Sequence, residues 1–348
     1  MICGAMILAG LFLAFAAAAS IHLVSDLNGY ARRGESAGAS PADPWERIVL
    51  LPEGAGFSGV IKALTDAGVV RDRRRFGRLA RVLGVDRRLM AGEYRFTSAM
   101  PPLEVLGKLA RGEVVLHGLT IPEGWTVREI AALAGEKRVG NPEDLLQRAL
   151  SPEYAAARRV EGGTLEGYLF PDTYHFPRNT SADRILEAML ARFEKAYTPS
   201  WEARARGLNL TRHQVVTLAS IIEKETGAAE ERPVIASVFH NRLKRGMRLQ
   251  SDPTVIYGIP DFDGNLTRVH LDTPTPYNTY RIGGLPPGPI ASPGKASLEA
   301  ALFPEETDFL YFVARGDGTH QFSASLEAHN EAVRRYQLGG NQTGGGDK

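Results

Sequence analysis

Residues Arg212–Thr226 read RHQVVTLASIIEKET, which is the most informative stretch of the chain. At about 100° per residue, four apolar side chains fall on one face of a helix: Val215, Leu218, Ile221 and Ile222. Glu225 lies four and three positions beyond the last two of these, so it projects from the same face. We therefore expect an amphipathic core helix that carries a glutamate at its C-terminal end, just before Gly227.

The two acids of the Glu-Lys-Glu sequence should have different surroundings. Around the helix axis, Glu223 is rotated by about 140° from Leu218, whereas Glu225 lies on the same apolar face as Ile221 and Ile222. We expect only Glu225 to be desolvated. Desolvation raises the pKa of a carboxyl group and keeps it protonated near neutral pH, which a general acid that cleaves a glycosidic bond requires. The alternative is a helix-terminal glutamate that pairs with an arginine.

The composition of the 348 residues disfavours several classes of protein. With 43% hydrophobic and 23% charged residues, the chain has room for one large or two modest globular domains. The net charge of +1 disfavours nucleic acid as a partner. The single cysteine, Cys3, can form neither a disulfide nor a cysteine metal site within the chain. The eight histidines contain no HExxH pair, so we expect no metal and no cofactor.

The first residues, Met1–Val24, contain no Asp, Glu, Lys or Arg and are long enough to span a bilayer. We expect a retained membrane anchor there, and a cleaved signal peptide is the alternative. Arg32 and Arg33 follow, so the positive-inside rule would place the bulk of the chain in the cytoplasm. An extracytoplasmic orientation therefore rests on the chemistry of the rest of the chain. We expect 25–46 to be a flexible tether and 339–348 a disordered tail.

Strand and helix patterns alternate between residues 47 and 118 and predict a small α+β module. The predicted strands and helices are, in order, 47–51, 57–67, 74–83, 92–96 and 101–111. This module carries no cluster of catalytic residues of its own. In 119–338, helical patterns alternate with connections rich in glycine and proline, and we expect a larger α+β domain that holds the active site.

Two polar and aromatic segments, 249–258 and 277–288, have residue types that suit carbohydrate recognition. The candidates for a substrate groove are Gln250, Ser251, Asp252, Tyr277, Asn278 and Tyr280. A role in shaping loops explains any one of them equally well. Glu166 and Asp172 flank an aromatic run. Each is either a second acid or, the interpretation we favour, a group that bonds nearby backbone. Glu166 is also a candidate for substrate binding.

Five longer motifs stand in order along the chain: LEGYLFPDTY (165–174), ASIIEKET (219–226), ASVFHNRLKRGMRLQSDPTVIYG (236–258), TPTPYNTYRIGGLPPGPIASPG (273–294) and YFVARGDGTHQFSASLEAHN (311–330). Together they resemble the MltG, or YceG-like, family of endolytic murein transglycosylases. The resemblance runs from about Ile48 to Tyr336 and leaves out only the anchor, the tether and the tail.

This resemblance implies a peptidoglycan lytic transglycosylase, a lyase with one N-terminal membrane helix, a LysM-like module at 47–118 and a catalytic domain at 119–338 outside the cytoplasmic membrane. It maps the catalytic glutamate onto Glu225, in agreement with the helical argument. It adds Thr226 as a substrate-binding candidate, because the Glu-Thr pair is similar to the Glu-Ser pair of other lytic transglycosylases. It also implies action on nascent glycan strands, which ends their elongation, with peptidoglycan synthases as partners.

A single acid fits such an activity, whereas ordinary glycosidases use two carboxylates. In a lytic transglycosylase the 6-hydroxyl of muramic acid attacks its own anomeric carbon. Glu225 would first protonate the leaving oxygen and then accept the proton of that hydroxyl, which leaves a 1,6-anhydro-MurNAc end. Two alternatives stay open: a hydrolytic muramidase that uses Glu225 with Glu166 or Asp172, and a non-catalytic cell-wall binding scaffold.

Overall fold

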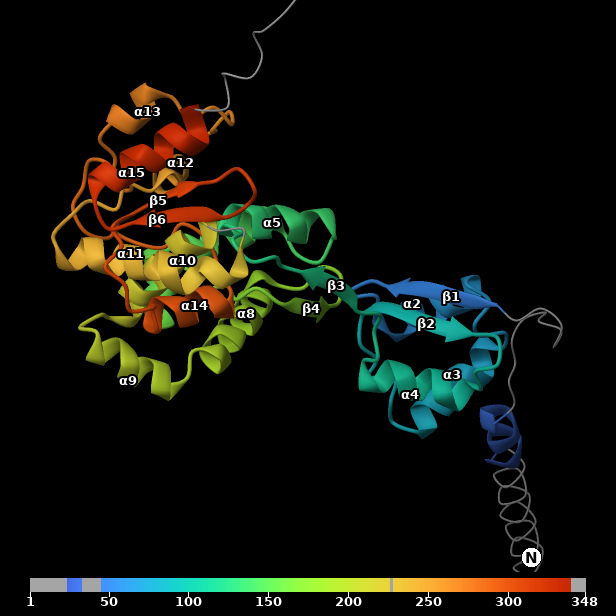
Figure 1. The fold of residues 1–348 in the computed structure, drawn as a ribbon. Coiled ribbons are helices and arrows are strands. Elements are labelled where there is room, and N and C mark those ends of the chain that lie inside the picture. The colour runs from blue at the N-terminus through green and yellow to red at the C-terminus, as the bar shows by residue number, and fades with distance from the viewer. Residues whose placement is uncertain (1–23, 33–44, 226–227, 339–348) are drawn as a thin grey trace, which may run out of the picture. The chain divides into compact units, whose positions relative to one another are not determined.

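The computed structural model of the chain describes residues 24–32, 45–225 and 228–338 (Figure 1). Close contacts divide the chain into two compact units, Met1–His117 and Gly118–Lys348. Helices are mixed with two-stranded sheets, which confirms the predicted α+β class. In the described residues no helix has the length and apolar character needed to cross a bilayer.

The N-terminal segments were predicted only in part. Apart from Val24, the predicted anchor lies outside the described residues, as does the predicted tail, 339–348. Residues 24–32 are helical, so the prediction of a flexible tether is wrong for this part of it. Leu27 and Tyr30, three residues apart on one helical face, are buried in the core of the first unit, and Asp26 pairs with Arg75 at 3.2 Å.

Besides the helix at 24–32, the described residues of the first unit form one antiparallel sheet and three packed helices, all close to the predicted positions. Its elements are β1 (Glu46–Leu51), α2 (Gly56–Asp66), α3 (Arg73–Val82), β2 (Gly92–Thr97) and α4 (Pro102–Arg111). In the sheet, Leu51 lies opposite Gly92. Val49 and Leu51 point into the core while Ile48 and Leu50 are exposed, because side chains alternate along a strand.

Two local signals in the sequence set helix ends in this unit. The Asp72 side chain accepts hydrogen bonds from the backbone N–H groups of Arg74 and Arg75 and so caps the start of α3. Gly112 adopts a left-handed conformation, with φ of 65°, and ends α4, as its position after the last apolar residue predicted.

The second unit is mainly helical and carries two small sheets, β3–β4 and β5–β6. Its elements are β3 (His117–Thr120), α5 (Val127–Glu136), α6 (Pro142–Ala149), α7 (Pro152–Ala157), β4 (Thr173–Phe176), α8 (Ala182–Ala196), α9 (Pro199–Gly207), α10 (Arg212–Glu225), η1 (Ala229–Glu231), α11 (Arg232–Lys244), α12 (Asp252–Tyr257), α13 (Arg268–Asp272), α14 (Lys295–Leu302), β5 (Tyr311–Ala314), β6 (His320–Ser323), α15 (Leu326–Val333) and η2 (Arg334–Leu338).

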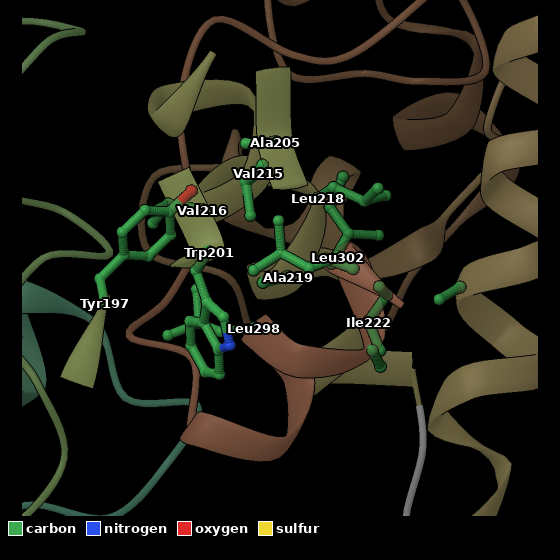
Figure 2. Close-up of a cluster of buried hydrophobic side chains, with 14 of the residues drawn as sticks. Tyr197, Trp201, Ala205, Val215, Val216, Leu218, Ala219, Ile222, Leu298 and Leu302 are labelled. Carbon is green, nitrogen blue, oxygen red and sulfur yellow. The ribbon is translucent and has the colours of Figure 1, made fainter. Parts of the chain in front are cut away.

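Helix α10 is the centre of the second unit. The sequence predicted a helix with one apolar face, but every residue from 215 to 222 is buried. Neighbouring helices α9, α11, α12 and α14 contact it, and Figure 2 shows Trp201 of α9 and Leu298 of α14 among the side chains packed around it. The prediction of a single buried face is therefore wrong, because partners from several directions cover the helix.

Two buried hydroxyl groups make burial on all sides possible for α10. Thr217 Oγ1 donates to the carbonyl oxygen of His213 at 2.8 Å. Ser220 Oγ donates to the Thr217 carbonyl at 2.7 Å and accepts the backbone N–H of Ile290 at 3.0 Å. Because each polar group has a partner inside the protein, it can leave water without a large loss of free energy.

Leu218→Ala should lower the free energy of unfolding by about 2–5 kcal/mol, because truncating a fully buried leucine loses apolar contacts and leaves a cavity. Urea-induced unfolding measures the change. Leu326→Ala in α15 is the matched control, since this side chain is 55% exposed, and it should change stability by less than about 0.5 kcal/mol. Equal effects of the two substitutions would contradict the central place of α10.

Candidate active site

The carboxyl group of Glu225 lies at the end of helix α10, and among the described residues its side-chain hydrogen-bond partner is Ser251. Ser251 Oγ donates a hydrogen bond of 2.5 Å to Glu225 Oε1. Burial raises the pKa of Glu225 to about 7. The hydrogen bond from Ser251 and the electrostatic effects of His320 and Arg242 lower this pKa, and the negative charge of Asp252 raises it. A carboxyl group with this pKa can both give and take a proton near neutral pH.

Ser251 is held rigidly just before α12. It is almost fully buried, and its backbone N–H donates to Thr279 Oγ1 at 3.0 Å. Thr254 Oγ1 donates to the Ser251 carbonyl at 2.6 Å, and the hydroxyl groups of Thr254 and Thr279 lie 2.8 Å apart. The preceding residue, Gln250, has a φ of 51° and donates its backbone N–H to the Thr279 carbonyl at 3.2 Å. The loop therefore places the Ser251 hydroxyl in one position against Glu225.

Asp252 and Tyr280 form a second polar pair beside the acid. The Tyr280 hydroxyl donates to Asp252 Oδ1 at 2.7 Å. Burial, and then this bond to Asp252, raise the pKa of the Tyr280 hydroxyl above its ordinary range. Asp252 is exposed at the start of α12, so its carboxylate is open to solvent and to a ligand.

Asn278 and Tyr277 have different places from the other candidates. Asn278 is fully buried, and its Nδ2 donates to the carbonyl oxygens of His270, Leu271 and Thr273 at 3.3, 3.1 and 2.7 Å. These bonds give it the loop-shaping role that the sequence left open. The ring of Tyr277 lies against that of Tyr257, with centroids 4.8 Å apart. Thr226, the remaining candidate, lies outside the described residues.

Glu223 is buried as well, so the prediction that only Glu225 is desolvated is wrong. The side chain of Glu223 is 7% exposed. Its Oε2 accepts the backbone N–H of Gly294 at 2.9 Å, and its Oε1 lies 3.4 Å from the Arg232 guanidinium. Glu223 therefore links α10 to the start of α14 and to α11. The two acids differ in their partners, because an arginine neutralises Glu223 while Glu225 accepts a bond from a neutral serine.

Glu166 and Asp172 both make the backbone contacts that we favoured. Both carboxylate oxygens of the buried Glu166 accept the N–H of Val127, at 3.1 and 3.3 Å, which caps the start of α5, and Tyr257 donates to Oε2 at 3.1 Å. Burial raises the pKa of Glu166 to about 7, although these bonds lower it. Asp172 pairs with Arg192 at 2.5 Å and accepts the N–H of Thr173; both contacts lower its pKa.

A pocket of about 860 Å³ opens along α5 and α12, next to the end of α10. Lys224 lines it together with Glu166 and Tyr257. Helix α12 connects this pocket to the acid, since Ser251 stands before its first residue and Tyr257 is its last. Six helical residues span about 9 Å, so the end of α12 that lines the pocket lies about that far from the end that follows Ser251. The concavity is large enough for part of a polysaccharide.

Three residues of this region were missed in the sequence: Arg242, Glu231 and His320. The buried Arg242 donates from Nε to the Leu310 carbonyl at 2.6 Å and from a terminal nitrogen to the Leu249 carbonyl at 2.8 Å. It thereby joins the Ser251 loop to the start of β5. Burial lowers the pKa of its guanidinium. An arginine in a helix without a nearby acid carries no sequence signal for such a role.

No part of the described chain groups three or more His, Cys, Asp or Glu side chains in a way that could hold a metal ion. The polar groups around Glu225 are instead hydroxyl groups, one carboxylate, one guanidinium and one imidazole. Proton transfer between a carboxyl group and a bound substrate is the chemistry that this set of groups can perform.

Comparison with known proteins assigns the chain to a family. The model of the YceG-like family matches residues 49–335. The chain belongs to the YceG-like family. The endolytic murein transglycosylase of Bacillus subtilis (strain 168) is 31% identical over 304 residues, which cover 83% of this chain and 84% of that protein. The protein of the same name from Streptococcus pneumoniae serotype 2 is 32% identical over 320 residues, and here the match spans 83% of this chain but 58% of the relative.

A solved structure of the family has a related fold. The crystal structure of a yceG-like protein from Listeria monocytogenes superposes with a TM-score of 0.58 at 34% sequence identity. The match covers 83% of this chain and 99% of the Listeria chain. The resemblance found in the five sequence motifs is thereby confirmed at the level of the family.

Ser251→Ala should raise the pKa of Glu225 above its value of about 7, because the hydroxyl bond lowers that pKa. NMR titration of the glutamate carboxyl carbons measures this shift without substrate. Ser237→Ala is the matched control: Ser237 is also buried and bonds a hydroxyl, that of Thr307, at 2.8 Å. The pKa of Glu225 should stay unchanged in this control, and an unchanged value in Ser251→Ala as well would contradict the assigned contact.

Glu166→Gln should make the protein more stable than the wild type at pH 8 by on the order of 2–3 kcal/mol. The folded protein holds this carboxyl proton up to about pH 7, whereas the unfolded chain releases it near pH 4.5. The contribution of Glu166 to stability is therefore present below pH 4.5 and lost as the pH rises to 7 and above. Glutamine keeps an oxygen acceptor for the Val127 N–H but cannot ionise.

Urea-induced unfolding at pH 5 and at pH 8 tests this prediction. The stability difference between Glu166→Gln and wild type should grow between the two pH values. The exposed Glu327 offers a control, since Glu327→Gln should give the same small difference at both. A difference that is independent of pH for both variants would show that Glu166 ionises in the folded protein as it does in water.

Proposed function

We propose that this protein is a lytic transglycosylase that cleaves the MurNAc–GlcNAc bond of peptidoglycan strands from within, with Glu225 as its catalytic residue. The observation that carries the proposal is a carboxyl group with a pKa of about 7, bonded by Ser251 at the end of α10, one residue after Lys224, which lines an open pocket. Membership of the YceG-like family supports it, as does the activity for which the relatives from Bacillus subtilis and Streptococcus pneumoniae are named.

The reaction needs a proton to move twice through one group. The protonated Glu225 gives its proton to the glycosidic oxygen as the bond from that oxygen to the anomeric carbon breaks. The 6-hydroxyl of the same muramic acid then forms a bond to the anomeric carbon and gives its proton to the Glu225 carboxylate. The product is a 1,6-anhydro-MurNAc end, and no water is consumed. A pKa of about 7 suits a group that acts as acid and then as base.

The hydrolytic alternative requires a second carboxylate near the acid. Glu166 caps α5 and Asp172 pairs with Arg192, so neither supports that role. Asp252 is the acid whose charge raises the pKa of Glu225, and it is exposed. A hydrolase built on this site would therefore use Asp252 to activate water. In a lytic transglycosylase Asp252 serves instead to keep Glu225 protonated.

We further propose the setting in which the enzyme acts. Residues 1–24 form a single membrane helix, which the absence of charged residues supports, and the catalytic domain (119–338) lies outside the cytoplasmic membrane, where peptidoglycan is. The module at 47–118 is LysM-like and assists in holding glycan. Action on nascent strands would end their elongation and would place peptidoglycan synthases near the enzyme as partners. The family resemblance supports these assignments.

Glu225→Gln should reduce strand cleavage by about a hundredfold to ten-thousandfold without loss of the fold, because glutamine cannot donate the proton. The assay uses uncrosslinked glycan strands and identifies the new ends by mass spectrometry. Wild type should produce 1,6-anhydro ends. The exposed Glu230 provides the control, and Glu230→Gln should retain activity. Reducing ends in place of anhydro ends would establish a hydrolase, and full activity of Glu225→Gln would exclude Glu225 as the acid.

A further inference from the structure

The first unit carries a strongly basic segment that the mechanism above does not use. Residues 71–88 contain eight arginines, two aspartates and no other charged residue, whereas the whole chain has a net charge of +1. The remainder of the chain is therefore net acidic. The segment comprises helix α3 (Arg73–Val82) with the residues on either side of it. The positive charge of the protein is thus concentrated on one element of the first unit.

The arginines of this segment are exposed, and neighbouring acids do not balance their charges. Arg75 is the exception, since it is partly buried and lies 3.2 Å from Asp26 and 3.7 Å from Asp72. The other seven are exposed, and none of them forms an ion pair within the described parts of the chain. Guanidinium groups without carboxylate partners can bind an external anion without first breaking an internal bond.

Three of these arginines form a row along the outer face of α3. Arg74, Arg78 and Arg81 are spaced by four and three residues, which places them on one side of the helix. The other side is held in the core of the first unit by Phe76 and Leu79. The row extends over about 10 Å of helix. Because its helix is packed from behind, the row is a fixed array of positive charges that faces solvent.

Exposed apolar side chains adjoin the basic row. Val82, the last residue of α3, is 70% exposed, and the next residue, Leu83, is 45% exposed. Arg87 and Arg88 follow shortly after. A surface that combines arginines with exposed aliphatic side chains suits the boundary of a bilayer, where phosphate groups lie above hydrocarbon. A soluble polyanion would bind the arginines but would leave the aliphatic side chains in water.

The helix at 24–32 packs against the start of α3. Asp26 forms the ion pair with Arg75, and the Tyr30 hydroxyl donates to the carbonyl oxygen of the residue that caps α3, at 3.4 Å. Asp26 comes two residues after Val24, the last residue of the uncharged stretch that we propose as the membrane helix. The start of α3 is therefore attached beside the end of the proposed membrane helix. This position favours lipid headgroups over other anionic partners, because headgroups lie closest to it.

We propose that the outer face of α3, with the residues that follow it, is a docking surface for the headgroups of anionic phospholipids. The guanidinium groups bind phosphate oxygens, and Val82 and Leu83 enter the headgroup layer, so the first unit is held against the bilayer. The inference goes beyond the transglycosylase reaction and draws on the proposed membrane setting. These arginines do not decide the orientation of the chain, because the positive-inside rule counts charges within about 20 residues of a membrane helix and Arg71 lies farther along.

A fluorescent label at the end of α3 tests this proposal in the full chain. Cys3→Ser removes the only cysteine, and Val82→Cys then takes a single environment-sensitive label. The labelled protein is mixed with vesicles of phosphatidylcholine alone or with about one-third phosphatidylglycerol, each containing a lipid that quenches at headgroup depth. Quenching should be strong with phosphatidylglycerol and weak without it. Salt at about 0.5 M should remove most of the quenching, because it screens the charges.

Reversal of the charges in the row should abolish the contact. The variant Arg74→Glu, Arg78→Glu, Arg81→Glu should weaken docking by about a hundredfold or more, since each arginine near an anionic surface contributes roughly fivefold. Label emission with phosphatidylglycerol vesicles should then equal that with phosphatidylcholine vesicles. The matched control reverses three exposed arginines of the second unit, which changes the net charge equally and should keep the quenching: Arg184, Arg245 and Arg334.

Equal quenching with the two lipid mixtures, or none with either, would overturn the proposal, and so would an equal loss in both triple variants. Displacement of the label from phosphatidylglycerol by soluble polyphosphate at the same phosphate concentration would assign the surface to soluble polyanions instead. The salt comparison needs only the labelled protein, so undiminished quenching in salt overturns the proposal even where a triple variant does not fold. Flotation with phosphatidylcholine vesicles tests the membrane helix separately: its absence, with quenching by phosphatidylglycerol retained, would reject that helix and leave the docking surface in place.

Discussion

The second unit depends on one constraint. Helix α10 is buried on all sides along residues 215–222 and carries the carboxyl group of Glu225 at its end. Burial of residues 215–222 fixes the axis of α10, and the bond from Ser251 holds the carboxyl group of Glu225 at the end of this helix. The hydroxyl groups of Thr217 and Ser220 make this burial tolerable, because their bonds stay inside the protein. The position of the acid is thus a consequence of core packing and does not rely on a flexible loop.

The neighbours of Glu225 balance one another, and this balance sets its pKa. Burial and Asp252 favour the protonated form, while Ser251, His320 and Arg242 favour the carboxylate. A carboxyl group that donates a proton and then accepts one works best when its pKa lies near the working pH, because a strong preference for either form would slow one of the two steps. These residues come from β6, α11, α12 and the segment just before α12. Segments far apart in the sequence therefore have to fold together before the acid has a useful pKa.

Features set by interactions between residues close in the sequence could be predicted, and features set by contacts between distant residues could not. The helix at 212–225 and the strands and helices of 47–111 were predicted, because apolar periodicity, capping residues and glycine stops act over a few residues. Glu225 could be chosen from its helical face and its family motif. The contacts of Arg242 and His320 could not, since their partners lie tens of residues away. The helix at 24–32 was missed because its burial depends on the first unit.

Three buried glutamates in this unit explain why burial alone does not identify a catalytic acid. Glu223 is neutralised by Arg232, and Glu166 has a pKa of about 7 like Glu225. Both oxygens of Glu166 are engaged by the N–H of Val127, and Tyr257 adds a further donor. A carboxyl group already bonded to a helix start cannot reach a substrate without breaking that cap. Among the described residues, Glu225 accepts a side-chain bond from the neutral hydroxyl group of Ser251 and caps no helix, so under the proposed mechanism it can exchange a proton without breaking a helix cap.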